Sequence, residues 1–182
     1  MKRVERKEII DYLTYEDNRN AFRAHAMEIK AARRVHIGAY LTLLFENHTT
    51  VWYQIQEMIR AERIIRESDI LHEIETYNEL LGKQGELGCT LLIEIEDPRL
   101  RDQMLQQWLN LPETTYVRLE DGTRIQATFD ERQRGTGRLS SVQYLKFDTR
   151  GQVPIAAGVD LVDLQAETPL TSGQRQALRS DL

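Results

Sequence analysis

The prevailing spacing of apolar residues changes along the chain between about residues 82 and 87. Before this point, apolar side chains recur every three or four residues, as Phe22, Ala26 and Ile29 do, which is the spacing of one face of an α-helix. After it, short β-rich runs are separated by tight-turn sequences. We therefore expect a single α+β domain with a largely antiparallel sheet. Residues 1–82 should be mainly helical with a β-hairpin, and residues 87–182 mainly β with one internal and one C-terminal helix.

Within the helical half, a short N-terminal helical segment is followed by a helix that should run from a cap at Thr14 to about Arg33. The stretch VHIGAYLTLLFEN, with β-branched and aromatic residues around a glycine, predicts the hairpin. Two apolar stripes at helical spacing follow, formed by Val51, Ile55, Met58 and Ile65 and by Ile70, Ile74, Tyr77 and Leu81. The stripes are offset by roughly a quarter turn at about 100° per residue, so we expect a helix break near Ser68 and Asp69.

The second half begins with the strand GCTLLIEIED, in which alternation predicts that Glu94 and Glu96 face water while the apolar residues face the core. The Asp-Pro pair at 97–98 predicts the start of a helix that ends near residue 110. The Asp-Gly pair in TYVRLEDGTRIQATFD predicts a hairpin with a type I′ turn. The stretches RLSSVQYLKFD and VPIAAGVDL predict two more strands, and a final short helix should follow.

Charge and cysteine content restrict the class of protein. The net charge of -5 and the isoelectric point near 5.5 argue against a nucleic-acid binder, because such proteins carry a surplus of Lys and Arg. Cys89 is the only cysteine, so the chain cannot form an internal disulfide, which fits a reducing cytoplasm. The N-terminus MKRVERKEII lacks the apolar run of a signal peptide or membrane helix. We expect a cytoplasmic protein that neither binds nucleic acid nor enters a membrane.

Glu62 is the most unusual residue of the acidic stretch between Gln56 and Leu80. It falls in the middle of the first apolar stripe, where a buried carboxylate must find a partner, become protonated or bind a cation. Arg66 follows one helical turn later, so an ion pair is the ordinary interpretation. A metal or catalytic role is the alternative.

Two histidines are candidate metal ligands together with Glu62. His25 lies between Phe22 and Ile29 on an apolar helical face, where a hydrogen-bonded core histidine is the ordinary interpretation. His72 has carboxylates one turn away, a spacing similar to that of helical di-iron sites. The order is the reverse of the Glu-x-x-His of such sites, and Asp69-x-x-His72 is the only forward match, so a complete di-iron centre is not predicted, and no cofactor is identified.

A second helical stripe carries Tyr53, Glu57 and Arg60 on the side away from Val51. A phenol, a carboxylate and a guanidinium at this spacing can hold an anionic ligand or a partner helix, because Arg is a bidentate donor. A surface ion pair is the alternative.

A glycine-rich loop supplies a third candidate site. Arg132, Arg134 and Arg138 flank Gly135 and Gly137, whose backbone amides can cradle a phosphate. The spacing matches neither the phosphate-binding loop nor the dinucleotide fingerprint, so a solvated loop is the ordinary interpretation.

Several stretches are distinctive as a set, and they read VERKEIIDYLTYEDNRNAFR, LTLLFENHTTVWYQIQEMIRAERI, HEIETYNELLG, GELGCTLLIEIEDP, RLEDGTR and RLSSVQYLKF. Together they resemble an uncharacterised bacterial family of about this length, a domain of unknown function. The resemblance implies genes placed beside rubrerythrin-like and iron-sulfur oxidoreductase proteins, and hence an iron-linked or peroxide-defence setting. It implies no catalytic residues.

Three hypotheses follow. The first is a cytoplasmic accessory or binding protein, a homo-oligomer, that serves such a redox partner through the helices between Gln56 and Leu80. The second is a small metalloenzyme that uses Glu62 with His25 or His72. The third is a nucleotide or anion sensor that uses the arginine-rich loop.

Overall fold

The computed structural model describes residues 1–130 and 137–182. Its helical elements, in chain order, are the 3₁₀ turn η1 (Arg6–Glu8), α1 (Tyr12–Ala31), α2 (His48–Glu62), α3 (Glu67–Asn78), α4 (Pro98–Gln107), α5 (Leu111–Thr114) and α6 (Ser172–Asp181). Its strands are β1 (Arg34–Ile37), β2 (Leu41–Phe45), β3 (Glu86–Ile93), β4 (Thr115–Arg118), β5 (Arg124–Gln126), β6 (Thr128–Phe129), β7 (Val142–Asp148), β8 (Ala156–Val159) and β9 (Ala166–Pro169).

The described strands form two sheets in which every pairing is antiparallel. The larger has the order β1-β2-β3-β7-β6 and the smaller the order β5-β4-β8-β9. The chain passes from one sheet to the other between β5 and β6, where Ala127 donates its backbone N–H to Thr115 O at 2.9 Å. The α+β fold class expected from the sequence is therefore confirmed, with two antiparallel sheets in place of one.

Two apolar clusters hold these elements together. The larger fills the space between the sheets and takes alternate residues of the central strands, such as Leu43, Leu91 and Phe147, together with Leu105 and Leu178 from the helices. The smaller lies within the helical layer and consists of Val4, Ile9, Val51, Ile55, Ile59, Ile70, Ile74 and Leu81. Strand side chains alternate between the two faces of a sheet. The larger sheet therefore turns one face to the larger apolar cluster, and its other face carries polar residues and packs against the helices.

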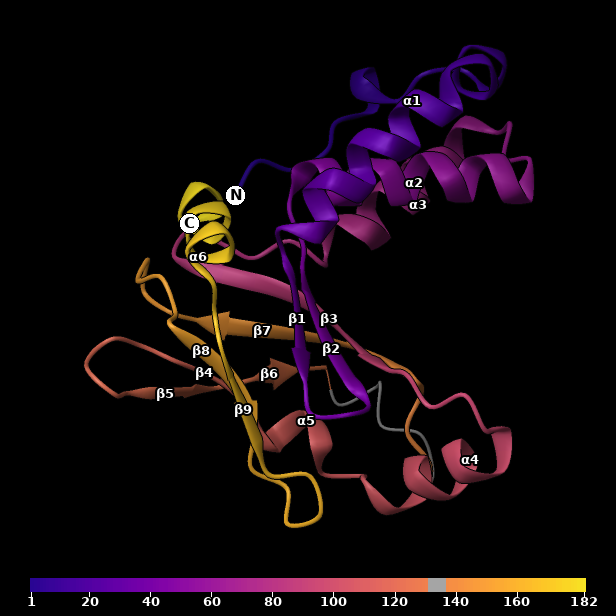
Figure 1. Ribbon diagram of the computed structural model, residues 1–182. Helices are drawn as coiled ribbons and strands as arrows, with labels where there is room; N and C mark the ends of the chain where they lie inside the picture. Colours follow the sequence, from indigo (N-terminus) through magenta and orange to yellow (C-terminus); the bar gives the residue numbers. More distant parts are fainter. Residues whose placement is uncertain (131–136) are drawn as a thin grey trace.

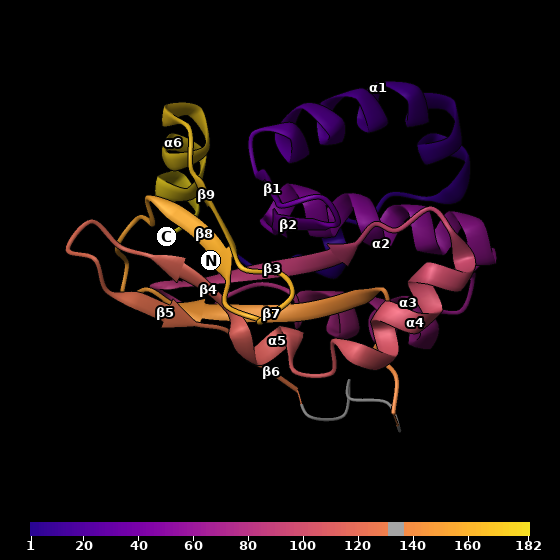
Figure 2. The ribbon, with the colours of Figure 1, turned by 60° about the horizontal axis from the view of Figure 1, so that its bottom comes forward.

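The helical layer of α1, α2 and α3 stands at one end of the β1-β2 hairpin, and α4 and α5 lie near its other end (Figure 1). Turned by 60°, the molecule shows α1 to α4 on one side and α6 with the β8-β9 pair on the other (Figure 2). The chain after α3 packs directly on β3. A Cβ atom on Gly88 would lie 1.8 Å from Leu80 O, so only glycine allows this approach. The contact fixes the end of α3 over the larger sheet.

The observed boundaries correct several local predictions. Helix α1 starts at Tyr12, because Asp11 rather than Thr14 is its cap and accepts a hydrogen bond from Thr14 N at 3.0 Å. The predicted break between the two middle helices is confirmed, but it comes earlier, between Glu62 and Glu67. No helix in the described part of the chain is long and apolar enough to cross a bilayer.

The predicted type I′ turn between β4 and β5 is wrong. Gly122 has a φ of 87°, whereas Asp121 does not have a positive φ. Gly122 N donates to Leu119 O at 3.1 Å, and Leu119 N donates to Thr123 O at 2.8 Å. The hairpin is thus closed by three residues with a single left-handed glycine, an arrangement in which only that position needs φ > 0.

Candidate functional site

A row of four residues crosses the larger sheet on the face toward the helical layer. The strand register pairs Arg34 with Leu44, Leu44 with Thr90, and Thr90 with Tyr144, so these side chains project from β1, β2, β3 and β7 on the same side. Arg34 is partly buried, while Tyr144 is 42% exposed. The row therefore runs from a cation at the edge strand to an aromatic ring near the opposite edge.

Glu46 is a buried carboxylate beside the middle of this row, two residues after Leu44 and next to Thr90. It follows β2 directly, and its backbone N–H donates to Gly88 O at 2.9 Å, which continues the pairing with β3. Its side chain accepts hydrogen bonds from the Thr50 hydroxyl at 2.5 Å and the Thr90 hydroxyl at 2.6 Å. Glu46 is only 6% exposed. Two hydroxyl donors thus hold an acidic group inside the protein, where an unpartnered one would be costly.

Lys30, in the last turn of α1, is a second cation near Glu46 and Arg34. Its ammonium nitrogen lies 5.4 Å from the centre of the Tyr53 ring, within cation–π range. Burial lowers the pKa of Lys30, and the nearby Glu46 carboxylate partly offsets that shift. Neither Lys30 nor Arg34 forms an ion pair with any residue of 1–130 or 137–182.

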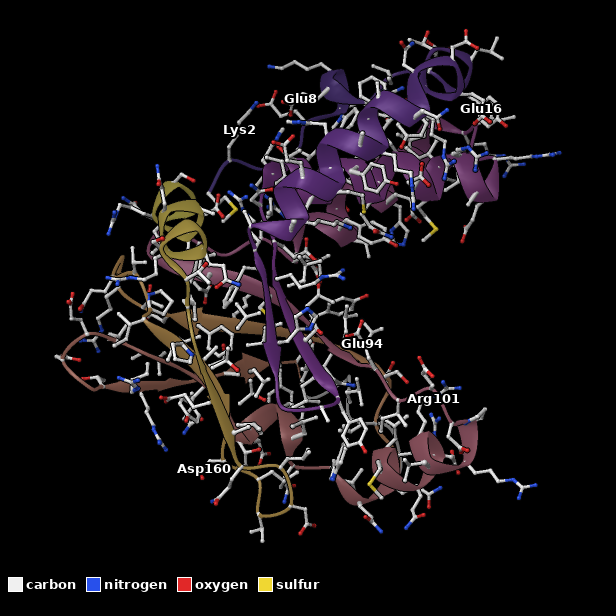
Figure 3. The ribbon with its side chains drawn as sticks, in the orientation of Figure 1. Lys2, Glu8, Glu16, Glu94, Arg101 and Asp160 are labelled. Atoms are coloured by element: carbon white, nitrogen blue, oxygen red, sulfur yellow. The ribbon has the colours of Figure 1, made fainter. Side chains whose placement is uncertain are left out.

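These groups line a hollow of about 290 Å³ between the helical layer and the sheet, which we call the cationic hollow. Its lining consists of Lys30, Arg34, Leu44, Glu46, Gln54, Tyr77, Leu80, Thr90, Leu92, Val142 and Tyr144. Burial raises the pKa of Tyr77, and a hydrogen bond with Gln54 acts in the opposite direction. Glu94 lies further along this side of the molecule, toward α4, and Glu16 lies at the far end of the helical layer (Figure 3).

The residue types in the cationic hollow favour the binding of an anion. A concave site with convergent polar groups and shifted pKa values is the usual setting of a ligand site. The hollow holds two cations, Lys30 and Arg34, and one carboxylate, Glu46. The sum of these charges is positive, and a ligand with one negative charge would balance it. The only cysteine, Cys89, points to the other side of β3 and is 2% exposed, and burial raises the pKa of its thiol well above the ordinary value.

Apart from Tyr53, whose ring lies next to Lys30, the residues singled out by the sequence lie away from the cationic hollow, and the expected burial of Glu62 is wrong. Helix α2 ends at Glu62, and Arg63 then takes a left-handed conformation with a φ of 52°. Ile65 is therefore not on the helical stripe but 87% exposed, and both Glu62 and Arg66 are exposed. The stripe really ends at Ile59.

The expected core position of His25 is also wrong, because this residue is exposed on α1. His72 is exposed on α3 and lines, with Glu62 and Arg66, an open hollow of about 570 Å³ at the α2-α3 connection. Within residues 1–130 and 137–182, no three His, Cys, Asp or Glu side chains are grouped so that they could hold a metal ion.

The stripe of Tyr53, Glu57 and Arg60 faces a helix of the same chain. Glu57 accepts hydrogen bonds from Arg19 Nε at 2.8 Å, from Arg19 Nη2 at 2.7 Å and from the Tyr15 hydroxyl at 2.7 Å. Arg60 forms an ion pair with Glu16. These hydrogen bonds, above all those from Arg19, lower the pKa of Glu57. Glu57 and Arg60 thus contact α1 of the same chain, and Arg60 with Glu16, at 30% and 41% exposure, forms the surface ion pair that was the alternative interpretation.

The arginine-rich loop falls largely outside the described residues, which exclude Arg132, Arg134 and Gly135. Arg138 is described and pairs with Asp102 at 2.7 Å.

Sequence reasoning missed Lys30, Arg34, Glu46 and Thr90. A signal for two of them was present: Glu46 directly follows the apolar stretch LTLLF, and Thr90 interrupts an apolar strand. Their pairing depends on the register of β2 and β3, which the sequence does not specify.

Comparison with known proteins places the chain among uncharacterised relatives. A family model described as "Protein of unknown function (DUF3501)" matches residues 3–182. Among solved structures, the chain is similar to a protein of unknown function from Burkholderia pseudomallei K96243, with 27% sequence identity and a TM-score of 0.91 over 100% of both chains. No curated protein matches.

Proposed function

The chain belongs to the DUF3501 family of proteins of unknown function, and we propose that it is a binding protein for a small organic monoanion. The observation that supports this proposal is the cationic hollow. There, the half-buried Lys30 and Arg34 approach one buried carboxylate, Glu46, without ion-pair partners in the described part of the chain.

The charges of the hollow select the ligand. Lys30 and Arg34 attract an anion, and in a partly desolvated site each charge-assisted hydrogen bond is stronger than a neutral one. Glu46 repels a second negative charge, so a singly charged carboxylate fits better than a phosphate dianion or a dicarboxylate. The volume of about 290 Å³ is near the lower end for ligand sites, which suits a molecule of metabolite size.

Calorimetric and NMR titrations with monocarboxylates, phosphate and succinate test the proposal. We expect saturable binding of monocarboxylates in preference to the other two. Lys30→Met and Arg34→Met should each weaken binding at least tenfold, since each removes a charged donor worth about 1.5–3 kcal/mol. Lys83→Met is the matched control, because Lys83 is exposed outside the hollow. Circular dichroism confirms that each variant is folded. Absence of monocarboxylate binding, or equal binding by the variants, would overturn the proposal.

A second candidate function, contact with a protein partner, rests on a separate surface that we call the helical tip. It contains Tyr12 and Ile65, which are 42% and 87% exposed and line one hollow together with Arg63 and Ile64. Clustered exposed apolar side chains with a polar rim are typical of protein interaction sites. We propose that a second copy of the chain docks here. The tip carries Arg63 beside acidic groups, so a two-fold contact can pair unlike charges.

Sedimentation velocity at micromolar concentrations tests this contact. We expect a dimer that Ile65→Asp and Tyr12→Asp convert to a monomer, while Val162→Asp, at an 86% exposed position outside the tip, leaves it unchanged. A monomer that binds a purified iron-linked oxidoreductase through Ile65 would instead favour the accessory role implied by the family resemblance. A monomer that binds neither would contradict any docking role of the tip.

A further inference from the structure

The two cations of the cationic hollow lie on the opposite side of it from Val142 and Tyr144. The two cations come from the end of α1 and from β1, which is an edge strand of the larger sheet. Val142 and Tyr144 come from β7, three strands away in the order β1-β2-β3-β7. Neighbouring strands lie about 4.8 Å apart, so the aligned row from Arg34 to Tyr144 spans roughly 14 Å.

The β7 side of the hollow is apolar where a solvent-facing strand is usually polar. Val142 is 37% exposed and Tyr144 is 42% exposed, and both lie on the same face of β7. Leu92, paired with Val142 across the strands, is partly buried on this face. Antiparallel sheets with one solvated face normally alternate apolar residues inward and polar residues outward. Two successive outward positions of β7 depart from that pattern beside the hollow.

We infer that the ligand is an amphipathic monocarboxylate. Its carboxylate contacts Lys30 and Arg34, and its apolar body crosses the sheet over Leu92 toward Val142 and Tyr144. This inference rests on the proposed function and adds the chemical class of the ligand. A sugar acid of equal length would place hydroxyl groups against the aliphatic side chains of Leu92 and Val142, which offer them no hydrogen bonds, and burying such groups is unfavourable.

A homologous series of straight-chain acids tests the inference. Acetate, butanoate, hexanoate and octanoate share one head group and differ only in apolar length. We expect the dissociation constant to fall about three- to fourfold per methylene, the ratio that corresponds to burial of a CH₂ group. NMR titration measures the weak shorter members and calorimetry the longer ones.

A substitution on β7 distinguishes the binding of the apolar chain from the binding of the carboxylate. Val142→Asn should flatten the dependence on chain length and leave butanoate binding unchanged. Val162→Asn, at an 86% exposed position elsewhere, should preserve the dependence. If all the acids bind with one affinity that is lost in Lys30→Met, the amphipathic class is wrong and the proposed function stands. If none binds, or if binding is indifferent to Lys30→Met, both are overturned.

Discussion

Lys30 combines a charge that an anion needs with an environment that disfavours this charge. Burial lowers its pKa below the ordinary value of 10.5. Because the ammonium form binds the anion, affinity should fall as pH rises through this lowered pKa, before an exposed lysine would titrate. Lys30→Arg should remove the fall, since a guanidinium stays protonated. Octanoate titrations between about pH 7 and 10 check this, and parallel curves for the two proteins would contradict it.

The hydroxyl donors of Glu46 should contribute measurably to stability. Thr90→Val keeps the shape of the side chain but removes the 2.6 Å hydrogen bond to a buried carboxylate. A loss of about 1–3 kcal/mol in the free energy of unfolding is expected, as for other buried groups that lose a partner. Thr128→Val, at an exposed position on β6, should change it little. Urea denaturation measures both, and equal midpoints would show that Glu46 does not depend on Thr90.

For individual residues, the sequence pattern pointed to Glu62 and not to Glu46 or Thr90, and the reason is physical. Glu62 appeared to interrupt an apolar stripe only because the helix was assumed to continue to Ile65, and one left-handed residue, Arg63, ends it earlier. Glu46 and Thr90 are 44 positions apart and meet through strand pairing. Residue types alone do not reveal such a contact.

At the scale of elements, Glu57 accepts three of the hydrogen bonds that join α1 to α2, beside the ion pair of Arg60 with Glu16. Glu57→Gln weakens two hydrogen bonds from Arg19 and should destabilise the fold by about 1–3 kcal/mol. Glu62→Gln, on the same helix but exposed, should have almost no effect. Since the pKa of Glu57 is lowered in the folded protein, its stabilisation is complete above the ordinary value of 4.5 and is lost as pH falls through the lowered pKa.

Chemical denaturation at pH 7 and pH 3 measures this prediction. The difference between the wild-type protein and Glu57→Gln should be smaller at pH 3. A larger effect of Glu62→Gln than of Glu57→Gln would restore the role that the sequence predicted for Glu62.

Elements with their own periodicity could be predicted from the sequence, and those without it could not. Helices α2 and α3 each carry an apolar stripe, and β3 is a short run rich in apolar residues, so their existence followed from the sequence pattern. The short strands β6 and β9 have two and four residues, and only their partners β7 and β8 define them. Division of the strands between two sheets likewise depends on long-range pairing.

On the scale of the whole molecule, an ion pair joins the C-terminal helix α6 to the connection between α1 and β1. Arg33, between α1 and β1, donates to Asp181 near the C-terminus at 2.7 and 2.9 Å, and their side chains are 7% and 6% exposed. Asn47 also contacts Asp181, at 3.4 Å. The pair fixes α6 beside the β1-β2 hairpin, which carries Arg34. Helix α6 therefore helps to hold Arg34 in its position in the candidate site.

Breaking this pair should be costly. Asp181→Asn leaves the Arg33 guanidinium buried without a counter-charge, and a loss of about 3–5 kcal/mol is expected. Asp163→Asn, at an exposed position, is the control. Thermal and urea unfolding measure the effect. A variant as stable as the wild-type protein would show that α6 is not needed to hold the rest of the fold.

The cationic hollow uses parts of both halves of the molecule, and amide NMR shifts during titration with octanoate test its role most directly. We expect saturable changes in the amide chemical shifts of Lys30, Arg34, Glu46 and Thr90, and no changes at the helical tip around Ile65. Shifts centred on the tip, or an unchanged spectrum, would contradict it.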